Sequence, residues 1–584
     1  MKEIRGRIYG VAGPTVVVKG MEGPTMNTVC LVGKDGLLGE IIRIKDELVT
    51  LQVYEDTGGL SLNEEVVSHA LPLSVKLGPG LLTNIFDGIQ RPLRKIRELT
   101  GGFISKGVKT PALDLERVWG FEPLKKAGES VSPGDVLGVV QETARIALKI
   151  MVPPGVSGVI KEIKGDGVSG SEPVCVLEDG TGIDLYQDWP VRMPRPFQYK
   201  LPPEVPFKTG QRVFDTLLPV AEGGTAIVPG GFGTGKTVVE QTIAKYATCD
   251  IVIYVGCGER GNEMSEILTD FPELKDPSTN LPLSLRTVIV VNTSNMPVAA
   301  REASIFTGIT IAEYYRDMGY SVALLADSIS RWAEALREIS SRLEEMPGEE
   351  GFPPYLATNL GGFYERSGRV KCLGDGERTG SITVISAVSP PGGDFSEPVT
   401  QASLRFAGSL WALDPDLAYR RHFPAVNWLA SFSLYHSELS GWFRDEIAPD
   451  MMDLRGRLYS LLQRQTELKD IIQIIGVEAL QESDRLTLEV ANMARESFLK
   501  QSVFNESDAF NTYEKQYWML KTIFSFMDAA ASALKRGVFI ETLLESPLRT
   551  RIIKMQNTPN EGYPKAAEEL IAAIENEFSM IEEK

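Results

Sequence analysis

The chain has 584 residues, with 60 Lys and Arg against 78 Asp and Glu, for a formal net charge of −18. At roughly one to two hundred residues per domain, this length predicts about three to five folding units and argues against a single compact domain. The acidic balance, with no block of Lys and Arg, argues against wholesale capture of nucleic acid, because phosphate binding needs a concentrated basic surface; a local basic groove stays open.

The targeting signals of exported and membrane proteins are missing from the sequence. Residues Met1 to Gly6 include no apolar core of an export signal, and no stretch approaches the roughly 18 to 20 apolar residues needed to span a bilayer. The cysteines are odd in number, widely spaced and without a Cys-x-x-Cys pair (Cys30, Cys175, Cys249, Cys257 and Cys372). We therefore expect reduced thiols in a cytosolic protein, and with only three scattered histidines we expect no zinc site.

Residues 1–75 predict a small β-barrel. Short β-rich runs alternate with glycine turns about every ten residues, at 8–10, 15–18, 40–44 and 49–54. Small barrels of this kind often bind oligonucleotides, but this segment lacks paired basic and aromatic stripes, which favours an assembly collar without a ligand.

Residues 110–190 predict a second β-rich module. Turn signals recur at 133–135, 153–155, 165–167 and 179–182. The stretches 131–140 and 151–163 resemble half of a biotinyl or lipoyl-type β-sandwich, but no Met-Lys-Met hairpin is present to carry a prosthetic group. We expect an inserted structural module.

Residues 191–434, together with 76–109, predict an α/β domain. Apolar strands at 225–228, 251–255, 287–291, 322–326 and 382–385 alternate with amphipathic helical segments. This alternation is typical of a largely parallel sheet with helices on both faces.

Residues 435–584 predict a helical domain. Leu454, Leu458, Leu461 and Leu468 repeat at helical spacing, and a last apolar stripe is formed by Leu570, Ile574, Phe578 and Ile581. Between them, residues 529–534 end in Lys-Arg-Gly at 535–537, which is typical of a charged last turn with a glycine cap. Such stripes are far more often core than ligand site.

One motif of the α/β domain predicts phosphate binding. It fits Gly-x-x-x-x-Gly-Lys-[Ser/Thr], stands between the strand 225–228 and the helical run 238–246, and comprises Gly230, Gly231, Phe232, Gly233, Thr234, Gly235, Lys236 and Thr237, with Val238 following. Glycines allow successive N–H groups to turn inward, and the helix N-terminus adds its positive dipole end. Lys236 would reach the β- and γ-phosphates, and the Thr237 hydroxyl would be a Mg²⁺ ligand. The alternative is a glycine turn with a solvated lysine.

Carboxylates follow two of the predicted strands. Asp327 ends the apolar strand 322–326, and in a P-loop sheet such an Asp supports Mg²⁺ directly or through its water, although a strand-ending Asp can also cap a helix. If strand 251–255 neighbours the P-loop strand, its end places a carboxylate where it could orient or deprotonate the attacking water. Glu259 is the candidate, Glu263 its rival, and a capping or surface carboxylate the alternative. Arg260 could bind the γ-phosphate or pair with a nearby acid.

Several stretches together resemble the catalytic A subunit of archaeal/vacuolar-type rotary ATPases. They are the P-loop with Phe232, Gly-Glu-Arg-Gly-Asn-Glu at 258–263, Asn-Thr-Ser-Asn-Met-Pro at 292–297, Ala-Asp-Ser at 326–328 with Ser-Arg-Trp at 330–332, and Ser-Pro-Pro-Gly-Gly-Asp at 389–394. The resemblance covers essentially the whole chain. It includes the insert, which distinguishes this kind of chain from the related F-type β chain and from the non-catalytic B chain.

The resemblance implies a role for each matching residue. It implies that Lys236 and Thr237 hold MgATP, Glu259 polarises the lytic water, Arg260 contacts the terminal phosphate and Asp327 supports the metal. Phe423 and Phe504 look like the two aromatic positions of the family's adenine pocket, although both could be ordinary core aromatics.

The resemblance also implies partners. They are a B subunit in an alternating A3B3 hexamer, central rotor and peripheral stalks, and a membrane sector that moves H⁺ or Na⁺, which places the chain peripherally on the cytoplasmic side of the cell membrane. The acidic segment 478–484 resembles the part that presses on the rotor, with a solvated acidic turn as the alternative. No arginine of this chain can be assigned as the charge-stabilising finger, and the resemblance implies that B supplies it.

One departure concerns the P-loop. It carries Thr234 where eukaryotic vacuolar enzymes have a cysteine, so a thiol switch is not available at that position.

Two other functions compete with a rotary ATPase. One is a hexameric RNA-translocating ATPase of the transcription-termination type, which the insert and the charge disfavour. The other is a nucleotide-binding ring component without turnover, against which intact Lys236 and Glu259 argue.

Overall fold

The computed structural model describes residues 3–101, 104–265, 269, 274–277, 279–476 and 479–581. Two compact units divide the chain: unit 1 comprises Met1–Leu201 and Cys249–Phe406, and unit 2 comprises Pro202–Thr248 and Ala407–Lys584. In these described ranges, no helix combines the length and the apolar character that a membrane crossing needs. The domain boundaries given above remain predictions, because compact units group segments by contact and do not mark where domains end.

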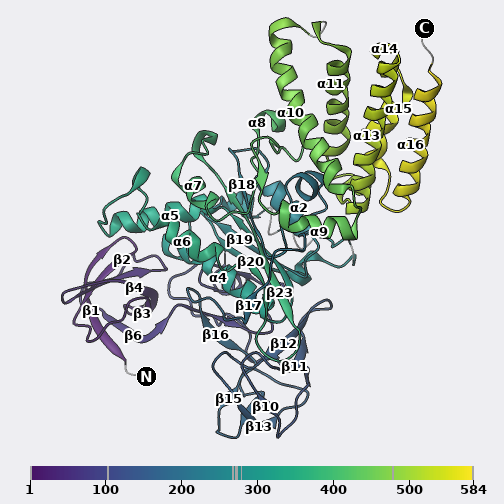
Figure 1. Cartoon of the computed structure of the whole chain (residues 1–584). Helices are drawn as coiled ribbons and strands as arrows, with labels where there is room; N and C mark the ends of the chain where they lie inside the picture. Colours follow the sequence, from purple (N-terminus) through teal and green to yellow (C-terminus); the bar gives the residue numbers. More distant parts are fainter. Residues whose placement is uncertain are drawn as a thin grey trace. The chain divides into compact units, whose positions relative to one another are not determined.

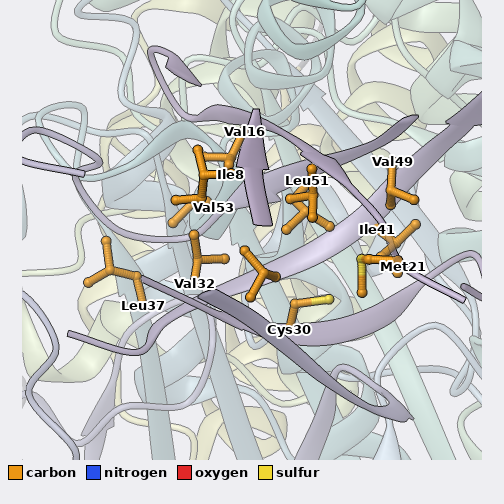
Figure 2. Packing of buried hydrophobic residues seen from close by; sticks show 12 residues of the cluster. Ile8, Val16, Met21, Cys30, Val32, Leu37, Ile41, Val49, Leu51 and Val53 are labelled. Carbon is orange, nitrogen blue, oxygen red and sulfur yellow. The ribbon is translucent and has the colours of Figure 1, made fainter. Parts of the chain in front are cut away.

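Unit 1 begins with a closed six-stranded barrel, as predicted. Neighbouring strands follow the order β1-β2-β5-β4-β3-β6, with bounds β1 (Ile4–Ala12), β2 (Thr15–Lys19), β3 (Thr28–Val32), β4 (Leu37–Lys45), β5 (Leu48–Val53) and β6 (Glu65–Pro72). Figure 2 shows the side chains that fill it, among them Ile8, Val16, Ile41 and Leu51, all at most 1% exposed. Closure leaves no open edge, because every strand has two partners.

The inserted module is built from short antiparallel strands. One sheet has the order β10-β13-β14-β15 and another β12-β11-β9, with bounds β9 (Phe121–Pro123), β10 (Ser130–Val131), β11 (Val136–Gln141), β12 (Ala147–Met151), β13 (Gly158–Ile163), β14 (Cys175–Leu177) and β15 (Gly182–Ile183). After them, β16 (Gln187–Pro190) pairs with β7 (Ser74–Leu77) of the segment that follows the barrel. The predicted β-rich character is confirmed.

A largely parallel sheet forms the rest of unit 1. Its parallel order is β23-β21-β19-β20-β8, with bounds β8 (Ile85–Phe86), β19 (Ile251–Cys257), β20 (Thr287–Asn292), β21 (Ser321–Asp327) and β23 (Thr379–Val388). Antiparallel β22 (Gly368–Lys371) pairs with β23, and β17 (Tyr199–Lys200) pairs with β22. Strands β19 and β20 are buried along their whole length, which continuous apolar runs covered on both faces require.

Helices surround this sheet. Helix α4 (Val298–Asp317), nearly all buried, packs against β19, β20, β21 and β23, and α5 (Ile329–Arg342) packs on α4 (Figure 1). The other helical segments of unit 1 are α1 (Leu93–Thr100), η2 (Leu283–Arg286), η3 (Glu349–Gly351), α6 (Leu356–Tyr364), η4 (Pro391–Gly393) and α7 (Pro398–Leu404).

Unit 2 joins a small strand group to helices. Strand β18 (Thr225–Pro229) pairs in parallel with β24 (Ser409–Leu410), which pairs antiparallel with β25 (Phe432–Ser433). The segments closest to them in sequence are η1 (Val213–Leu217), α2 (Lys236–Tyr246), α8 (Pro415–Tyr419) and α9 (His436–Glu446).

The carboxyl-terminal half of unit 2 is helical, as predicted (Figure 1). Its elements are α10 (Met451–Ile475), α11 (Glu482–Ala494), η6 (Arg495–Leu499), α12 (Glu506–Ala509), α13 (Tyr513–Lys535), α14 (Ile540–Leu544), α15 (Pro547–Lys554), η7 (Met555–Asn557) and α16 (Tyr563–Met580). The predicted leucine stripe of α10 is buried. The last stripe is buried through Phe578, while Ile581 follows the end of α16.

Candidate nucleotide-binding site

In unit 2 the predicted P-loop connects β18 to α2 as a strand, a glycine loop and a helix. The loop needs glycine at two positions, since Gly233 and Gly235 have φ of 76° and 94°, a region that residues with a Cβ rarely adopt. Gly235 is the residue before the first turn of α2, so the loop ends where the free N–H groups of the helix begin. This is the local geometry that binds phosphate groups in proteins.

The side chains of the loop are arranged around its own carbonyl groups. The Lys236 ammonium donates to the carbonyl oxygens of Gly230 at 2.7 Å and Gly231 at 2.9 Å, and the Thr234 hydroxyl donates to Gly231 at 2.9 Å. Phe232 is 86% exposed at the tip of the loop. The Lys236 positive charge therefore lies within the loop that would hold a polyphosphate.

A cavity of about 340 Å³ adjoins the loop within unit 2. Its wall includes Thr234, Gly235 and Val238 from the P-loop segment, together with Phe423 and Phe504. Phe504 is 95% exposed and Phe423 is 42% exposed, so neither is an ordinary core aromatic. The backbone N–H of Gln501 donates to the Phe423 carbonyl at 2.8 Å, which ties the two wall segments together. The volume is within the range of small-ligand sites.

In unit 1, Glu259 and Asp327 follow two paired strands. Strand β19 lies between β20 and β21, so the condition that it neighbours the P-loop strand is not met: both of its edges are already paired. Gly256 is in register with Asp327, which brings the end of β19, and hence Glu259, beside Asp327. The carboxylates meet because parallel strands end at the same edge of a sheet.

The electrostatics of this pair are unusual. Burial raises the pKa of Glu259 to about 7, and the negative charge of Asp327 and the neighbouring Glu263 carboxyl act in the same direction. Asp327 is 3% exposed. Two buried carboxyl groups this close supply oxygen atoms of the kind that Mg²⁺ prefers, and a cation would relieve their repulsion.

A close contact at Gly258 positions the residues around Glu259. Gly258 has φ of 74°, and a Cβ placed there would come within 2.5 Å of the Cβ of Arg331. Arg331 donates from one guanidinium nitrogen to both carboxylate oxygens of Glu334, at 2.8 and 2.9 Å. The sequence contained Arg331 without indicating this packing. Arg260, the next residue after Glu259, has an exposed side chain.

The remaining sequence-based expectations have mixed outcomes. All five cysteines are buried and unbridged, as expected, and burial raises the pKa of Cys257 to about 12. Of the acidic segment 478–484, Glu478 lies outside the described residues, while Glu482 begins α11.

Four family models match the chain. They are the ATP synthase alpha/beta family nucleotide-binding domain at 210–433, its β-barrel domain at 8–69, the alpha/beta barrel-sandwich domain of the same family at 110–192, and the C-terminal domain of V and A type ATP synthase at 440–544.

Curated relatives match over nearly the full length. An A subunit of the A-type ATP synthase of Methanospirillum hungatei, numbered 2, is 56% identical, covering 95% of this chain and 94% of the relative. The corresponding A-type ATP synthase A subunit of Methanopyrus kandleri is 55% identical over 99% of both chains, and the V-type ATP synthase alpha chain of Thermoanaerobacter pseudethanolicus is 54% identical over 94% of both. These relatives do not favour the RNA-translocating alternative.

A solved structure shares the fold. The assembled ATPase EscN from the type III secretion system of enteropathogenic E. coli superimposes with a TM-score of 0.63, covering 89% of this chain and 99% of that one, at 22% identity. Identity at that level shows the fold alone. The relatives of more than 50% identity carry the stronger conclusion: the chain belongs to the family of A subunits, or alpha chains, of A- and V-type ATP synthases.

Proposed function

We propose that the chain is the catalytic subunit of a rotary A/V-type ATPase, hydrolysing or synthesising ATP in step with H⁺ or Na⁺ movement through partner membrane subunits. The observation that carries the proposal is the P-loop: a glycine turn that ends at the start of α2 with the Lys236 ammonium inside it. It stands in a chain that matches ATP synthase A subunits from end to end.

The phosphate and metal ligands come from two sequence regions. Lys236 is proposed to pair with the β- and γ-phosphates, while the backbone N–H groups of Gly230 to Val238 cradle them. Thr237 supplies a hydroxyl to Mg²⁺, and Asp327 supports the ion through one of its waters. Bound Mg²⁺ would neutralise charge on the phosphates. Hydroxyl and carboxylate oxygen is the ligand set that this ion prefers, which supports the assignment.

Glu259 is proposed to act on the attacking water. A general base works best with a pKa near the working pH, and burial beside Asp327 raises the pKa of Glu259 to about 7. In its ionised form the carboxylate accepts a proton from the water, and in the synthesis direction it returns one. Arg260 is proposed to contact the terminal phosphate.

The base is proposed to bind in the unit 2 cavity. Phe423 and Phe504 present large exposed faces to it, and aromatic faces stack on purines. Pocket and P-loop share Thr234, Gly235 and Val238, so a nucleotide with its base in the cavity has its phosphates at the loop.

The partners are proposed from the family. They are a B subunit in an alternating A3B3 hexamer that supplies an arginine finger, the central rotor stalk acting on the segment 478–484, a peripheral stalk, and a membrane ion-translocating sector. The chain would then work peripherally at the cytoplasmic side of the cell membrane, without nucleic acid.

Reconstitution tests the proposal. The chain is co-expressed with its rotor partners and the B subunit. ATP hydrolysis is measured with and without RNA, and with Na⁺ or a proton uncoupler for the membrane-bound complex. We expect hydrolysis that depends on Mg²⁺ and is indifferent to RNA. Hydrolysis stimulated by RNA would support the termination-type alternative, and nucleotide binding without any turnover would support a non-catalytic ring component.

A further inference from the structure

One amide oxygen in the wall of the unit 2 cavity has no hydrogen-bond partner. Gln211 contributes to this wall and is only 1% exposed. Its side-chain nitrogen donates to the Ala509 carbonyl at 2.7 Å, but its Oε1 is buried and pairs with nothing in the part of the chain that the structure describes. An unpaired buried acceptor is costly, so a ligand that donates to it gains affinity.

The surroundings hold this amide in one orientation. Turning it by half a rotation would place Oε1 against the Ala509 carbonyl oxygen, which is also an acceptor, so the nitrogen stays on that side. The backbone on both sides is fixed as well: the N–H of Gln211 donates to the Thr209 hydroxyl at 3.1 Å, and the N–H of Arg212 donates to the Gln501 side chain at 2.8 Å. The oxygen is therefore the only part of this amide left to a ligand.

Other polar groups of the wall are already engaged. The Thr234 and Thr242 hydroxyls donate to backbone carbonyls, and the Asp508 carboxylate is held by Arg212 and by the N–H of Ser502. Among buried side-chain atoms of the described wall, the unpaired ones are two acceptors, Oε1 of Gln211 and Oε1 of Gln556. Gln556 is partly exposed, whereas Gln211 is fully buried. The wall thus lacks a partner that donates.

We propose that Gln211 reads the base by accepting a hydrogen bond from the 6-amino group of adenine, which makes it a specificity-determining residue. The inference rests on the proposed function, since it needs the base of the nucleotide in this cavity. At position 6 adenine carries a donor, whereas guanine and hypoxanthine carry a carbonyl oxygen that would face the Gln211 oxygen. A site built to pair with a donor rejects an analogue that leaves the buried acceptor unpaired.

Binding of matched nucleotides tests the inference. Dissociation constants of the full-length chain are measured calorimetrically for ATP, for purine riboside triphosphate, which lacks only the 6-amino group, and for ITP. We expect ATP to bind ~3- to 10-fold more tightly than the purine analogue, as one neutral hydrogen bond provides, with ITP weaker still. In Gln211→Met, similar in size but without the acceptor, the ratio between ATP and the purine analogue falls to about one.

The control is Gln556→Met, which changes the other unpaired acceptor of the same wall and should keep the wild-type ratio. A ratio near one in the wild-type chain, or a wild-type ratio retained in Gln211→Met, overturns the inference. A loss of selectivity in Gln556→Met alone reassigns the reading to that residue. These outcomes differ from failure of the proposed function, in which the chain binds none of the three nucleotides. The wild-type comparison stands even if the variant does not fold.

Discussion

Glu259 combines burial with a neighbouring carboxylate, and this combination makes it the most informative single residue of unit 1. We expect Glu259→Gln to bind MgATP with little change, because the amide keeps the size and polarity of the side chain. Turnover should fall by at least ~100-fold, the usual contribution of a general base. Calorimetric binding measures the first quantity, and hydrolysis by the complex that includes the B subunit measures the second.

Glu263→Gln is the matched control for this residue, since it changes the rival carboxylate in the same way. It should retain turnover. Near-normal hydrolysis by Glu259→Gln, or a comparable loss in Glu263→Gln, would remove Glu259 from the proposed role.

The pH dependence of kcat/KM gives a second test of the same residue. Glu259 acts when ionised and has a pKa of about 7 in the nucleotide-free chain, so kcat/KM should fall about tenfold per pH unit below 7. The Glu263 carboxyl raises the pKa of Glu259, so Glu263→Gln should lower that pKa and move the acid limb to lower pH. An unshifted limb would show that another group controls it.

Phe423 allows a test of the cavity that leaves the chemistry alone. Phe423→Ala should weaken ATP binding by about 1–3 kcal/mol, the usual contribution of a base stacked on an aromatic ring, and should change kcat at saturating ATP much less. Tyr419→Ala is a suitable control, because Tyr419 is 86% exposed and is not part of the cavity wall. Unchanged affinity in Phe423→Ala would place the base elsewhere.

At the scale of elements, a buried ion pair joins the start of η1 to α12. Arg212 is fully buried and pairs with Asp508, which is 2% exposed, and it also donates to the Phe498 and Lys500 carbonyls at 2.6 Å each. Removing one charge of a buried pair leaves the other uncompensated. We expect Asp508→Asn to lower the free energy of unfolding of unit 2 by about 3 kcal/mol.

Thermal and denaturant unfolding measure this loss. The control is Asp445→Asn, which breaks an exposed pair with Arg444 and should change stability by less than ~1 kcal/mol. Equal effects of the two substitutions would show that Arg212 finds compensation elsewhere. The result also bears on the cavity, because Asp508 and Gln501 belong to its wall.

At the scale of the whole molecule, the chain is proposed to be an incomplete catalyst. An arginine finger contributes about 10³ to 10⁵ in rate, and the finger is proposed to come from the B subunit. We therefore expect the isolated chain to bind ATP but to hydrolyse it at least ~1,000-fold more slowly than the A3B3 complex. Steady-state hydrolysis before and after addition of B measures the difference. Full activity of the isolated chain would contradict the shared site.

Local features of this protein could be predicted from the sequence with good accuracy. The P-loop, the strands β18 to β23 that begin with apolar runs, and the leucine face of α10 all appear where periodicity and glycine spacing indicate them. Each depends on residues close together in the chain: a φ that only glycine adopts readily, or an apolar repeat matched to one helix or strand period.

The order of strands could not be predicted in this way. The sequence allows β19 as a neighbour of the P-loop strand, but β19 pairs with β20 and β21. Apolar runs of similar length are interchangeable as sequence, and which two of them pair depends on how the helices between them cover the sheet.

The sequence by itself determined the family, the phosphate-binding loop and the succession of β-rich, α/β and helical segments, because these follow from motifs and short-range periodicity. Only the tertiary structure decided that Glu259 lies beside Asp327, and that Gln211, Phe423 and Phe504 share one cavity with the P-loop. Those neighbours are brought together by burial between segments distant in the chain, as in the pairing of Arg212 with Asp508 across 296 positions. A single sequence without an alignment carries no local signal for such contacts.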